Sequence, residues 1–521
     1  MLNEDVIYLI MPARYGGING IRERLPYLAD LGVTALWLTP VFKSMSYHGY
    51  DITDYYDVDP RYGTIDDYKA LVREAHQHGL KIIMDIVLNH CGIEHPWCKQ
   101  PPAPDWFNSL PATLAGRQDS SLFTLHSSLT NYRLTTVVDP YAADFDRKQT
   151  IEGAFTRKMP DLNLRNPQLL KYFTDCTQWW IEYTHIDGIR IDTFPYADRQ
   201  ATEEFMHALH TRYPDLHIIG ETWVTDTPFI ASMQQGELDS PMDFALFSAF
   251  GYAKHEETDA PWSGLNRIYN TLCYDYLYKN PAKVMAFLDN HDVSRFLEDY
   301  YPNSEKADAM LKALKMSLAI LLTLPRIPQI YYGTEVLMGG TTGKSDSKVR
   351  KPFPKRCLTS EGRTPAENDM HRFLRRILQW RKQNSELIAY GTMKQFLPYN
   401  GIYVYERKLD KSSMFLNEPS VGLRPSDYNV PLGTCDAFTK ATGRLKECSM
   451  SPKILVIANG SSKSALWTPE RYAEVIGTAT TGTDIISGRT VSLTKPLRLS
   501  PRKVMIIVPT HEASNKSIRK N

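Results

Sequence analysis

The chain has 521 residues, of which 42% are hydrophobic and 23% are charged, and this composition excludes disorder as its dominant state. Lysine plus arginine number 60 and aspartate plus glutamate number 59, so the formal net charge is +1. The basic excess typical of nucleic-acid-binding proteins is missing, so we expect an uncharged partner and no nucleic acid. The longest apolar run, residues 316–324, is shorter than the roughly 20 residues of a membrane-spanning helix, so we expect no membrane insertion.

Short apolar runs alternate with helical patterns over the first 385 residues. Apolar residues recur at helical spacing from Ile65 until Gly79, and Asn166 followed by Pro167 is typical of a helix start. The runs that we interpret as strands are residues 6–10, 35–38, 82–88, 186–191, 217–219, 244–247, 284–288 and 327–331. Eightfold alternation predicts an α/β protein with a closed (β/α)₈ TIM barrel. A doubly wound open sheet is disfavoured because no glycine-rich phosphate loop follows the first strand.

The alternation of strands and helices is interrupted twice, and these interruptions divide the chain into domains. No strand–helix unit is evident between the third strand and Asn166, and apolar runs after the last helix at 401–407, 454–459 and 504–508 indicate a β-rich unit. We therefore expect the barrel in two parts (1–90 and 166–385), an inserted domain (91–165), a C-terminal antiparallel β-domain (386–510) with an irregular insertion (409–452), and a polar tail (511–521).

Polar side chains gather at the ends of four predicted strands. The third run contains Asp85 and is followed by His90. The fourth contains Arg190 and is followed by Asp192. The fifth is followed by Glu221 and Trp223, and the seventh by His291 and Asp292. In a parallel barrel the carboxyl ends of all strands meet at one rim, where active sites lie. A single such residue is explained by a helix cap, but four strand ends together predict a shared active site.

The residue types point to cleavage of a glycosidic bond. Asp192, Glu221 and Asp292 supply three carboxylates without a phosphate loop or a metal cluster, and glycosidases use one carboxylate as nucleophile or base and one carboxylic acid as proton donor. Arg190 shares a strand face with Asp192, and its charge favours the ionised carboxylate that a nucleophile needs. Glu221 follows an apolar run, where partial desolvation raises its pKa and suits a proton donor.

Further motifs complete a resemblance to a known family. They are residues 32–40 (GVTALWLTP), 47–50 (YHGY) and 159–163 (MPDLN). Together with the four strand ends they resemble the conserved segments of the α-amylase family of retaining α-glucan hydrolases. The resemblance implies that the inserted domain is that family's domain B. It also implies a double-displacement mechanism in which Asp192 is the nucleophile, Glu221 the acid/base and Asp292 the stabilising carboxylate.

The resemblance further implies contacts to the bound sugar. The residues at the matching positions are Tyr50, His90, Arg190 and His291, whereas Asp85 matches a supporting carboxylate. Tyr196 and Trp223 either line the acceptor side of the site or pack in its wall. His48 is interpreted as a turn cap, and Asp346 and Arg350 as solvated residues of a loop after the eighth strand.

Three shorter sequence motifs indicate a branch of the family. Residues 50–56 (YDITDYY), 192–196 (DTFPY) and 331–335 (YYGTE) look like those of neopullulanases and cyclomaltodextrinases. That branch implies cleavage of α-1,4 bonds in maltooligosaccharides, cyclodextrins, pullulan or starch. An α-1,6-glucosidase or an α-glucan transglycosylase on the same scaffold is the alternative, and a non-catalytic barrel that binds a sugar or a partner is a third.

The sequence departs from this branch near its first strand. The branch usually has an N-terminal β-domain that helps it dimerise, and this chain begins at the first strand, so the oligomeric state stays open. The usual calcium loop is also missing and Ala13 replaces its aspartate; the resemblance allows calcium, but we expect that no cofactor or metal is required.

Two further sequence features concern compartment and thiol chemistry. The acidic N-terminus is not a secretory signal, so the compartment is undecided: periplasmic if a precursor was trimmed, otherwise cytoplasmic. Cys91 and Cys98 flank His95, but no second cluster completes a zinc site.

Overall fold

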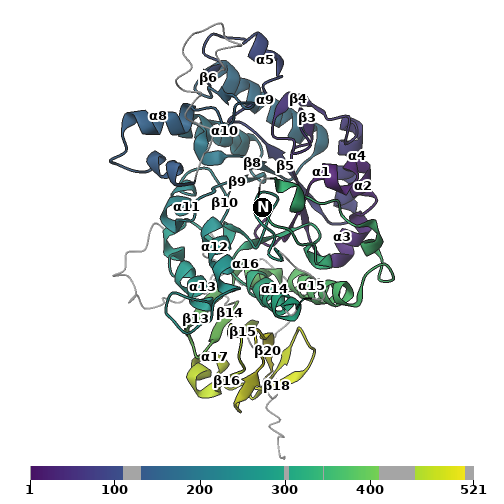
Figure 1. The fold of residues 1–521 in the computed structure, drawn as a ribbon, viewed down its shortest axis with the longest axis vertical. Helices are drawn as coiled ribbons and strands as arrows, with labels where there is room; N and C mark the ends of the chain where they lie inside the picture. Colours follow the sequence, from purple (N-terminus) through teal and green to yellow (C-terminus); the bar gives the residue numbers. More distant parts are fainter. Residues whose placement is uncertain are drawn as a thin grey trace, which may run out of the picture.

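The computed structural model of the chain describes residues 2–109, 131–298, 304, 306–343, 345–409 and 452–510. Its barrel strands are β1 (Ile7–Ile10), β2 (Ala35–Leu38), β5 (Lys81–Ile86), β8 (Gly188–Ile191), β9 (His217–Gly220), β10 (Ser240–Pro241), β11 (Met285–Phe287) and β12 (Ile327–Tyr331). They form one parallel sheet in the order β10-β9-β8-β5-β2-β1-β12-β11 (Figure 1). A parallel bridge between Met242 and Met285 joins the two outer strands. The predicted (β/α)₈ barrel is therefore confirmed.

Helices cover the outside of the barrel. They are α1 (Pro12–Tyr15), α2 (Gly17–Arg22), α3 (Leu25–Leu31), α4 (Ile65–Gln77), α9 (Pro167–Thr184), α10 (Arg199–Arg212), α11 (Thr227–Met233), α12 (Phe244–Ala253), α13 (Leu265–Leu272), α14 (Ala307–Leu321), α15 (Pro365–Gln383) and α16 (Ser385–Tyr390). The Asn166 side chain accepts hydrogen bonds from the backbone N–H groups of Gln168 and Leu169, which confirms the predicted start of α9. No helix among the described residues is long and apolar enough to cross a bilayer.

The sequence predicts the sixth strand at residues 244–247, and this prediction is wrong. Those residues open α12, and the strand is the shorter Ser240–Pro241 segment. The Asp243 side chain starts the helix by accepting a hydrogen bond from the backbone N–H of Leu246 at 2.8 Å. Periodicity cannot distinguish a short apolar run in a buried helix from a buried strand, which explains the error. The other seven strands overlap the predicted ranges.

Two excursions from the barrel lie on the side of its strand ends. The first is a hairpin of β3 (Phe42–Ser44) and β4 (Ile52–Val58). The second, between β5 and α9, contains α5 (Pro96–Lys99), β6 (Phe107–Ser109), α8 (Asp144–Glu152) and β7 (Asp161–Leu162), with β6 antiparallel to β7. Buried Asp161 accepts hydrogen bonds from the side-chain amides of Asn89 and Asn108 at 2.7 and 2.8 Å. The Asn89 contact joins this second excursion, domain B, to the segment that follows β5.

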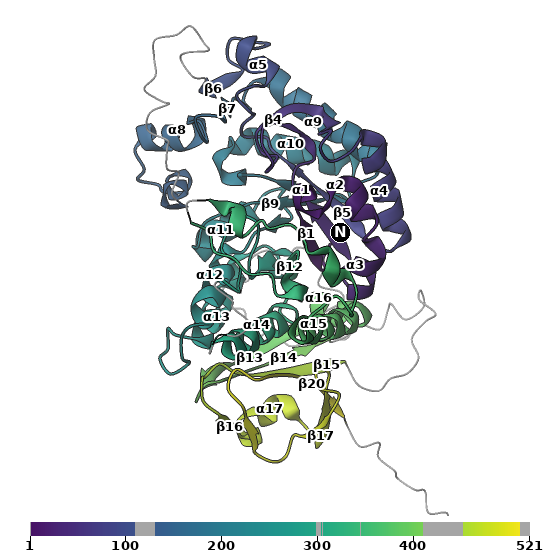
Figure 2. The same cartoon turned by 45° about the vertical axis from the view of Figure 1, so that its right-hand side comes forward.

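The C-terminal unit is an antiparallel β-domain, as predicted. Its six-stranded sheet has the order β13 (Thr392–Tyr399), β14 (Ile402–Lys408), β15 (Lys453–Asn459), β20 (Val504–Thr510), β17 (Thr481–Asp484) and β18 (Thr490–Ser492), and a second ladder pairs β16 (Ala465–Trp467) with β19 (Leu497–Leu499) beside α17 (Ala473–Ile476). The sheet lies below α14, α15 and α16 (Figure 2). Most of the predicted insertion at 409–452, and all of the tail at 511–521, fall outside the described residues.

A buried ion-pair cluster holds the start of α12 to the eighth barrel strand, and this contact gives a testable prediction. The Arg326 guanidinium contacts Asp243 at 3.3 Å and Asp275 at 2.5 Å. Replacing Arg326 by methionine leaves the Asp243 carboxylate buried without its cation, and we expect the free energy of unfolding to fall by about 3–5 kcal/mol. Urea denaturation followed by tryptophan fluorescence measures this change.

An exposed pair supplies the matched control. Arg375 contacts Asp30 at 2.6 Å near the surface, and solvent screens that pair, so Arg375→Met is expected to cost about 1 kcal/mol or less. Equal losses in the Arg326 and Arg375 variants would contradict a special role for the buried cluster.

Candidate active site

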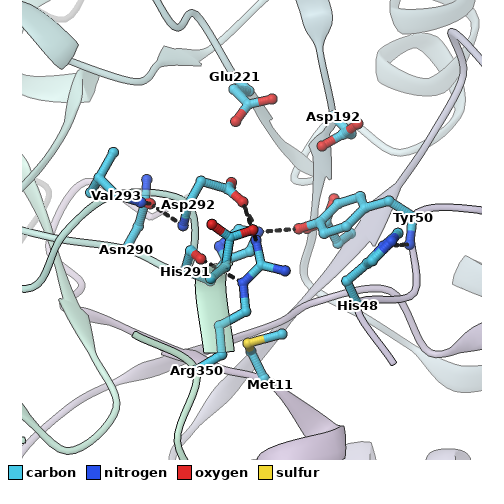
Figure 3. Close-up of polar contacts among 12 residues, drawn as sticks. Met11, His48, Tyr50, Asp192, Glu221, Asn290, His291, Asp292, Val293 and Arg350 are labelled. Carbon is cyan, nitrogen blue, oxygen red and sulfur yellow. Dashed lines mark hydrogen bonds and ion pairs between the residues drawn. The ribbon is translucent and has the colours of Figure 1, made fainter. Parts of the chain in front are cut away.

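The strand ends bring the predicted catalytic residues together at one cavity. Asp192 follows β8, Glu221 follows β9, and Asp292 lies in the loop after β11. Figure 3 shows the three carboxylates directed toward a common space. The cavity measures about 390 Å³ and is lined by His48, Tyr50, Phe155, Met159, Asp192, Thr193, Pro195, Tyr196, Glu221, Trp223, Asp292, Asp346 and Arg350.

The Arg190 guanidinium lies beneath this cavity and contacts three carboxyl groups. Its Nη1 is 2.6 Å from Asp192 Oδ1 and 2.9 Å from Asp85 Oδ1, and its Nη2 is 2.8 Å from Glu221 Oε1. Arg190 and Asp85 are fully buried, whereas Asp192 and Glu221 keep 6% and 4% exposure at the cavity. Arg190 does not line the cavity, so it positions the carboxyl groups from below.

The two carboxyl groups that line the cavity beside Arg190, Asp192 and Glu221, hold their protons unusually strongly. Burial raises the pKa of Glu221 to about 8, and the charges of Asp192 and Asp292 add to the effect while Arg190 opposes it. Burial likewise raises the pKa of Asp192 above its usual range, with Arg190 again opposing. One guanidinium cannot neutralise three ionised carboxylates. Near neutral pH the cluster therefore keeps a proton, and Glu221 is its preferred site.

Asp292 has the opposite environment. Burial raises its pKa, but the charge of Arg350 and the adjoining His291 ring outweigh burial and hold the pKa below its ordinary value. Arg350 Nη2 is 2.8 Å from Asp292 Oδ1, and Arg350 Nε donates to the His291 carbonyl at 2.7 Å (Figure 3). The sequence-based interpretation of Arg350 as a solvated loop residue is wrong, because its side chain is buried against Asp292.

Tyr50 and His291 connect the two sides of the site. The Tyr50 hydroxyl donates to Asp85 Oδ2 at 2.9 Å and lies 2.6 Å from His291 Nε2, and the two rings stack 5.5 Å apart. Burial lowers the pKa of His291 to about 3, so the ring is neutral. Its Nε2–H then donates toward Tyr50 and toward Asp292 Oδ2, which is 3.1 Å away. Tyr50 reaches the cavity, whereas His291 supports it from behind.

The remaining predicted sugar contacts form or support the walls. Trp223 lines the cavity and stacks on Phe244 at 5.4 Å, and Tyr196 lines it beside Phe155. His90 does not line the cavity; its ring stacks under Phe155 at 4.9 Å. Tyr196 and Trp223 are thus placed both to pack and to meet a ligand.

The cavity is also lined by residues that were not predicted as part of the site, among them His48, Phe155 and Met159. His48 caps the turn as expected, because its Nδ1 accepts from the Tyr50 N–H at 3.1 Å, but it also lines the cavity. Phe155 and Met159 come from domain B, where the sequence has no strand–helix rhythm to orient side chains. Only the YHGY motif gave a signal for His48, and nothing local marked Phe155.

The residues that the structure describes contain no group of three or more His, Cys, Asp or Glu side chains arranged to hold a metal ion. After β1 the backbone enters α1 almost at once, at Pro12. The expectation that no metal or cofactor is needed stays a prediction.

Comparison with known proteins defines the class. Residues 5–415 match the model of the α-amylase catalytic domain, and residues 449–508 match that of the cyclomaltodextrinase C-terminal domain. The chain therefore belongs to the α-amylase family.

Similar proteins place it more narrowly. An intracellular maltogenic amylase of Bacillus subtilis is 29% identical over 82% of this chain and 66% of its own, and neopullulanase 2 of Thermoactinomyces vulgaris is 31% identical over 65% and 52%. The chain thus spans two thirds or less of the length of these relatives. An α-amylase of Geobacillus thermoleovorans, solved with acarbose, shares the fold with a TM-score of 0.73 at 24% identity over 98% of this chain and 100% of that one. The resemblance to the neopullulanase and cyclomaltodextrinase branch is confirmed.

The Arg350–Asp292 contact generates a prediction. Loss of a hydrogen bond to a charged group costs about 1.5–3 kcal/mol, so Arg350→Ala should lower kcat/KM for maltoheptaose by roughly ten- to a hundredfold. Adding Asp292→Ala to Arg350→Ala should cost less than Asp292→Ala costs the parent enzyme, because the two residues act as one unit. Arg356→Ala, which removes an exposed guanidinium paired with Glu367 away from the cavity, is the control. Additive losses would argue against the coupling.

Proposed function

We propose that this chain is a retaining glycosidase that cleaves α-1,4-glucosidic bonds in maltooligosaccharides, cyclodextrins, pullulan or starch. The observation that carries the proposal is the Arg190 guanidinium, which contacts Asp192 through one nitrogen and Glu221 through the other. A shared guanidinium keeps the two carboxyl groups close, and a short separation is what a retaining glycosidase needs. The names of the relatives, maltogenic amylase, cyclomaltodextrinase and neopullulanase, support the choice of substrate.

In the first step Asp192 acts as nucleophile. Its carboxylate attacks the anomeric carbon while Glu221 gives its proton to the departing glycosidic oxygen, so the glycosidic bond breaks and a glycosyl ester forms. Arg190 Nη1, at 2.6 Å from Asp192 Oδ1, steadies the ionised nucleophile. The raised pKa of Glu221 supplies the proton near neutral pH.

In the second step the roles of Glu221 reverse. The ionised Glu221 removes a proton from a water molecule, the water oxygen attacks the anomeric carbon, and the ester to Asp192 breaks. Two inversions at the same carbon give net retention. Glu221 Oε2 accepts a hydrogen bond from the Thr193 N–H at 2.9 Å, which holds the carboxylate in place through both steps.

Asp292 binds the sugar ring at the cleavage site. Because Arg350 and His291 keep it ionised, it accepts hydrogen bonds from ring hydroxyls and favours the positive charge that develops in the transition state. Tyr50 supplies an aromatic face at the same position. We further propose that the reaction requires no metal or cofactor, because each chemical step uses only these carboxyl groups and water.

The product profile tests this proposal. Maltoheptaose and β-cyclodextrin should yield maltose and glucose, and pullulan should yield panose, with products separated by chromatography. Proton NMR of fresh maltoheptaose digests should show the α-anomer first, because retention preserves the configuration.

An Asp192→Asn variant is the control for this experiment. It should lose at least about a thousandfold in kcat, because the nucleophile is absent in the transition state, whereas Asp175→Asn on the exposed face of α9 should not. Turnover by folded Asp192→Asn protein would show that Asp192 is not the nucleophile. Inactivity of the folded parent enzyme on all three glucans would redirect the proposal to an α-1,6-glucosidase or a binding subunit.

The pKa of Glu221 predicts the pH dependence. Glu221 must be protonated, so kcat/KM should fall as the pH rises through about 8. Asp192 must be ionised, so kcat/KM should also fall as the pH drops through its raised pKa. A pH–rate profile on maltoheptaose measures both limbs.

An activated substrate separates the two limbs. Fluoride leaves α-maltosyl fluoride without needing a proton, so the alkaline limb should disappear with that substrate while the acid limb stays. An alkaline limb that is the same for both substrates would assign it to another group.

A further inference from the structure

Cys91 and Cys98 lie at the base of domain B and take no part in the proposed mechanism. Their Sγ atoms are 4.0 Å apart, and both side chains are buried. Cys91 follows His90 at the end of the third barrel strand, and Cys98 lies in α5. A disulfide has an S–S distance of about 2.05 Å, so an approach of roughly 2 Å joins the two sulfurs.

We propose that this pair is an oxidative modification site, at which a peroxide converts the two thiols into an intramolecular disulfide that fastens α5 to the barrel. The proposal depends on the geometry of the two thiols. It holds independently of the substrate that the enzyme cleaves.

The packing around each cysteine determines which of the two moves to form the bond. The backbone at Cys91 is fixed: its N–H points to the Pro160 carbonyl at 3.4 Å, and the next N–H donates to the Ile52 carbonyl at 2.8 Å. Gly92 is also packed closely, because a Cβ there would meet the Asp51 carbonyl oxygen at 2.5 Å. Cys98 by contrast sits in a one-turn helix, and such short segments open locally at low cost.

The helix that carries Cys98 is a surface segment. Its residues Pro96 and Lys99 are exposed, so a local opening of α5 gives a small oxidant access to the Cys98 sulfur. Cys98 is therefore the first sulfur to react.

The chemistry balances with hydrogen peroxide as oxidant. The Cys98 thiolate attacks one peroxide oxygen, the O–O bond breaks, and a sulfenic acid forms as hydroxide leaves and takes up the thiol proton as water. The Cys91 sulfur then attacks the Cys98 sulfur, the S–O bond breaks, and a second water leaves. Two thiols lose two protons and two electrons, and one peroxide becomes two waters. A hydrogen bond from Cys91 lowers the pKa of the Cys98 thiol, which favours Cys98 as the first nucleophile.

The disulfide would stabilise an aromatic cluster between domain B and the barrel. Trp97, next to Cys98, packs against Trp106 at 5.2 Å, Tyr172 of α9 at 4.9 Å and Tyr55 of β4 at 5.9 Å. A cross-link restricts the unfolded chain and opposes separation of these rings. We therefore expect oxidised enzyme to lose activity more slowly on heating, with a half-life roughly three- to tenfold longer than that of reduced enzyme.

Peptide mapping tests the bond directly. Full-length protein carrying Cys273→Ser, which removes the one exposed thiol among the described residues, is treated with hydrogen peroxide, alkylated and digested with trypsin. Residues 82–99 contain no internal lysine or arginine, so both cysteines stay in one peptide, which should be about 2 Da lighter than the unalkylated thiol form. Glu94 lies between them, so further cleavage with Glu-C should leave two fragments joined only by the disulfide. Dithiothreitol should separate the fragments and restore the shorter half-life.

Two variants complete the test. Cys98→Ser should give no linked fragments and no change in half-life on oxidation. Cys176→Ser, which removes a nearby buried thiol that donates to the Tyr55 carbonyl, should still form the bond. Two alkylated cysteines in residues 82–99 after oxidation would overturn the modification site. Linked fragments with an unchanged half-life would overturn its stabilising role.

Discussion

The site depends on one buried cation that is outnumbered by carboxyl groups. Arg190 is fully buried and contacts Asp85, Asp192 and Glu221 within 2.9 Å. A buried charge is tolerated only when it is paired, so at least one carboxylate must be ionised. Three cannot be, because they would leave excess negative charge in a region that water barely reaches. The shortage of positive charge therefore places a carboxyl that keeps its proton beside an ionised one, which is what the proposed acid and nucleophile require.

The opposite side of the cavity has more positive charge for each carboxyl group. Asp292 is contacted by Arg350, which also pairs with Asp346, and by the Nε2–H of His291, so its pKa lies below the ordinary value. Tyr50 lies between the two groups, with its hydroxyl on Asp85 and His291. The number of cations for each carboxyl group acts together with burial to separate a carboxyl that keeps its proton from one that loses it.

The regular part of the molecule could be predicted from its sequence, and the irregular part could not. Asp192, Glu221 and Asp292 follow strands, and parallel strands end at a common rim, so their meeting follows from the fold. Arg350 and Phe155 lie in long connections whose course depends on tertiary contacts, which no periodicity encodes. The prediction of the sixth strand was wrong for a related reason. The strand has only two residues, one of them proline, so its hydrophobic pattern is too short to recognise. The apolar residues that begin α12 nearby give a stronger strand-like pattern.

Because the barrel supplies the floor of the cavity, the walls must distinguish one glucan from another. Phe155 and Met159 reach the cavity from domain B, and domain B is held by Asp161, which accepts from Asn89 directly after β5, and by the aromatic contacts of Trp97. Relatives that share this barrel carry different names for their activities, maltogenic amylase and neopullulanase among them. The contacts at the base of domain B therefore position part of the wall, and the contacts of Arg190 position the carboxyl groups beneath it. In the proposed enzyme, the choice of glucan and the cleavage of its bond thus depend on separate parts of the fold.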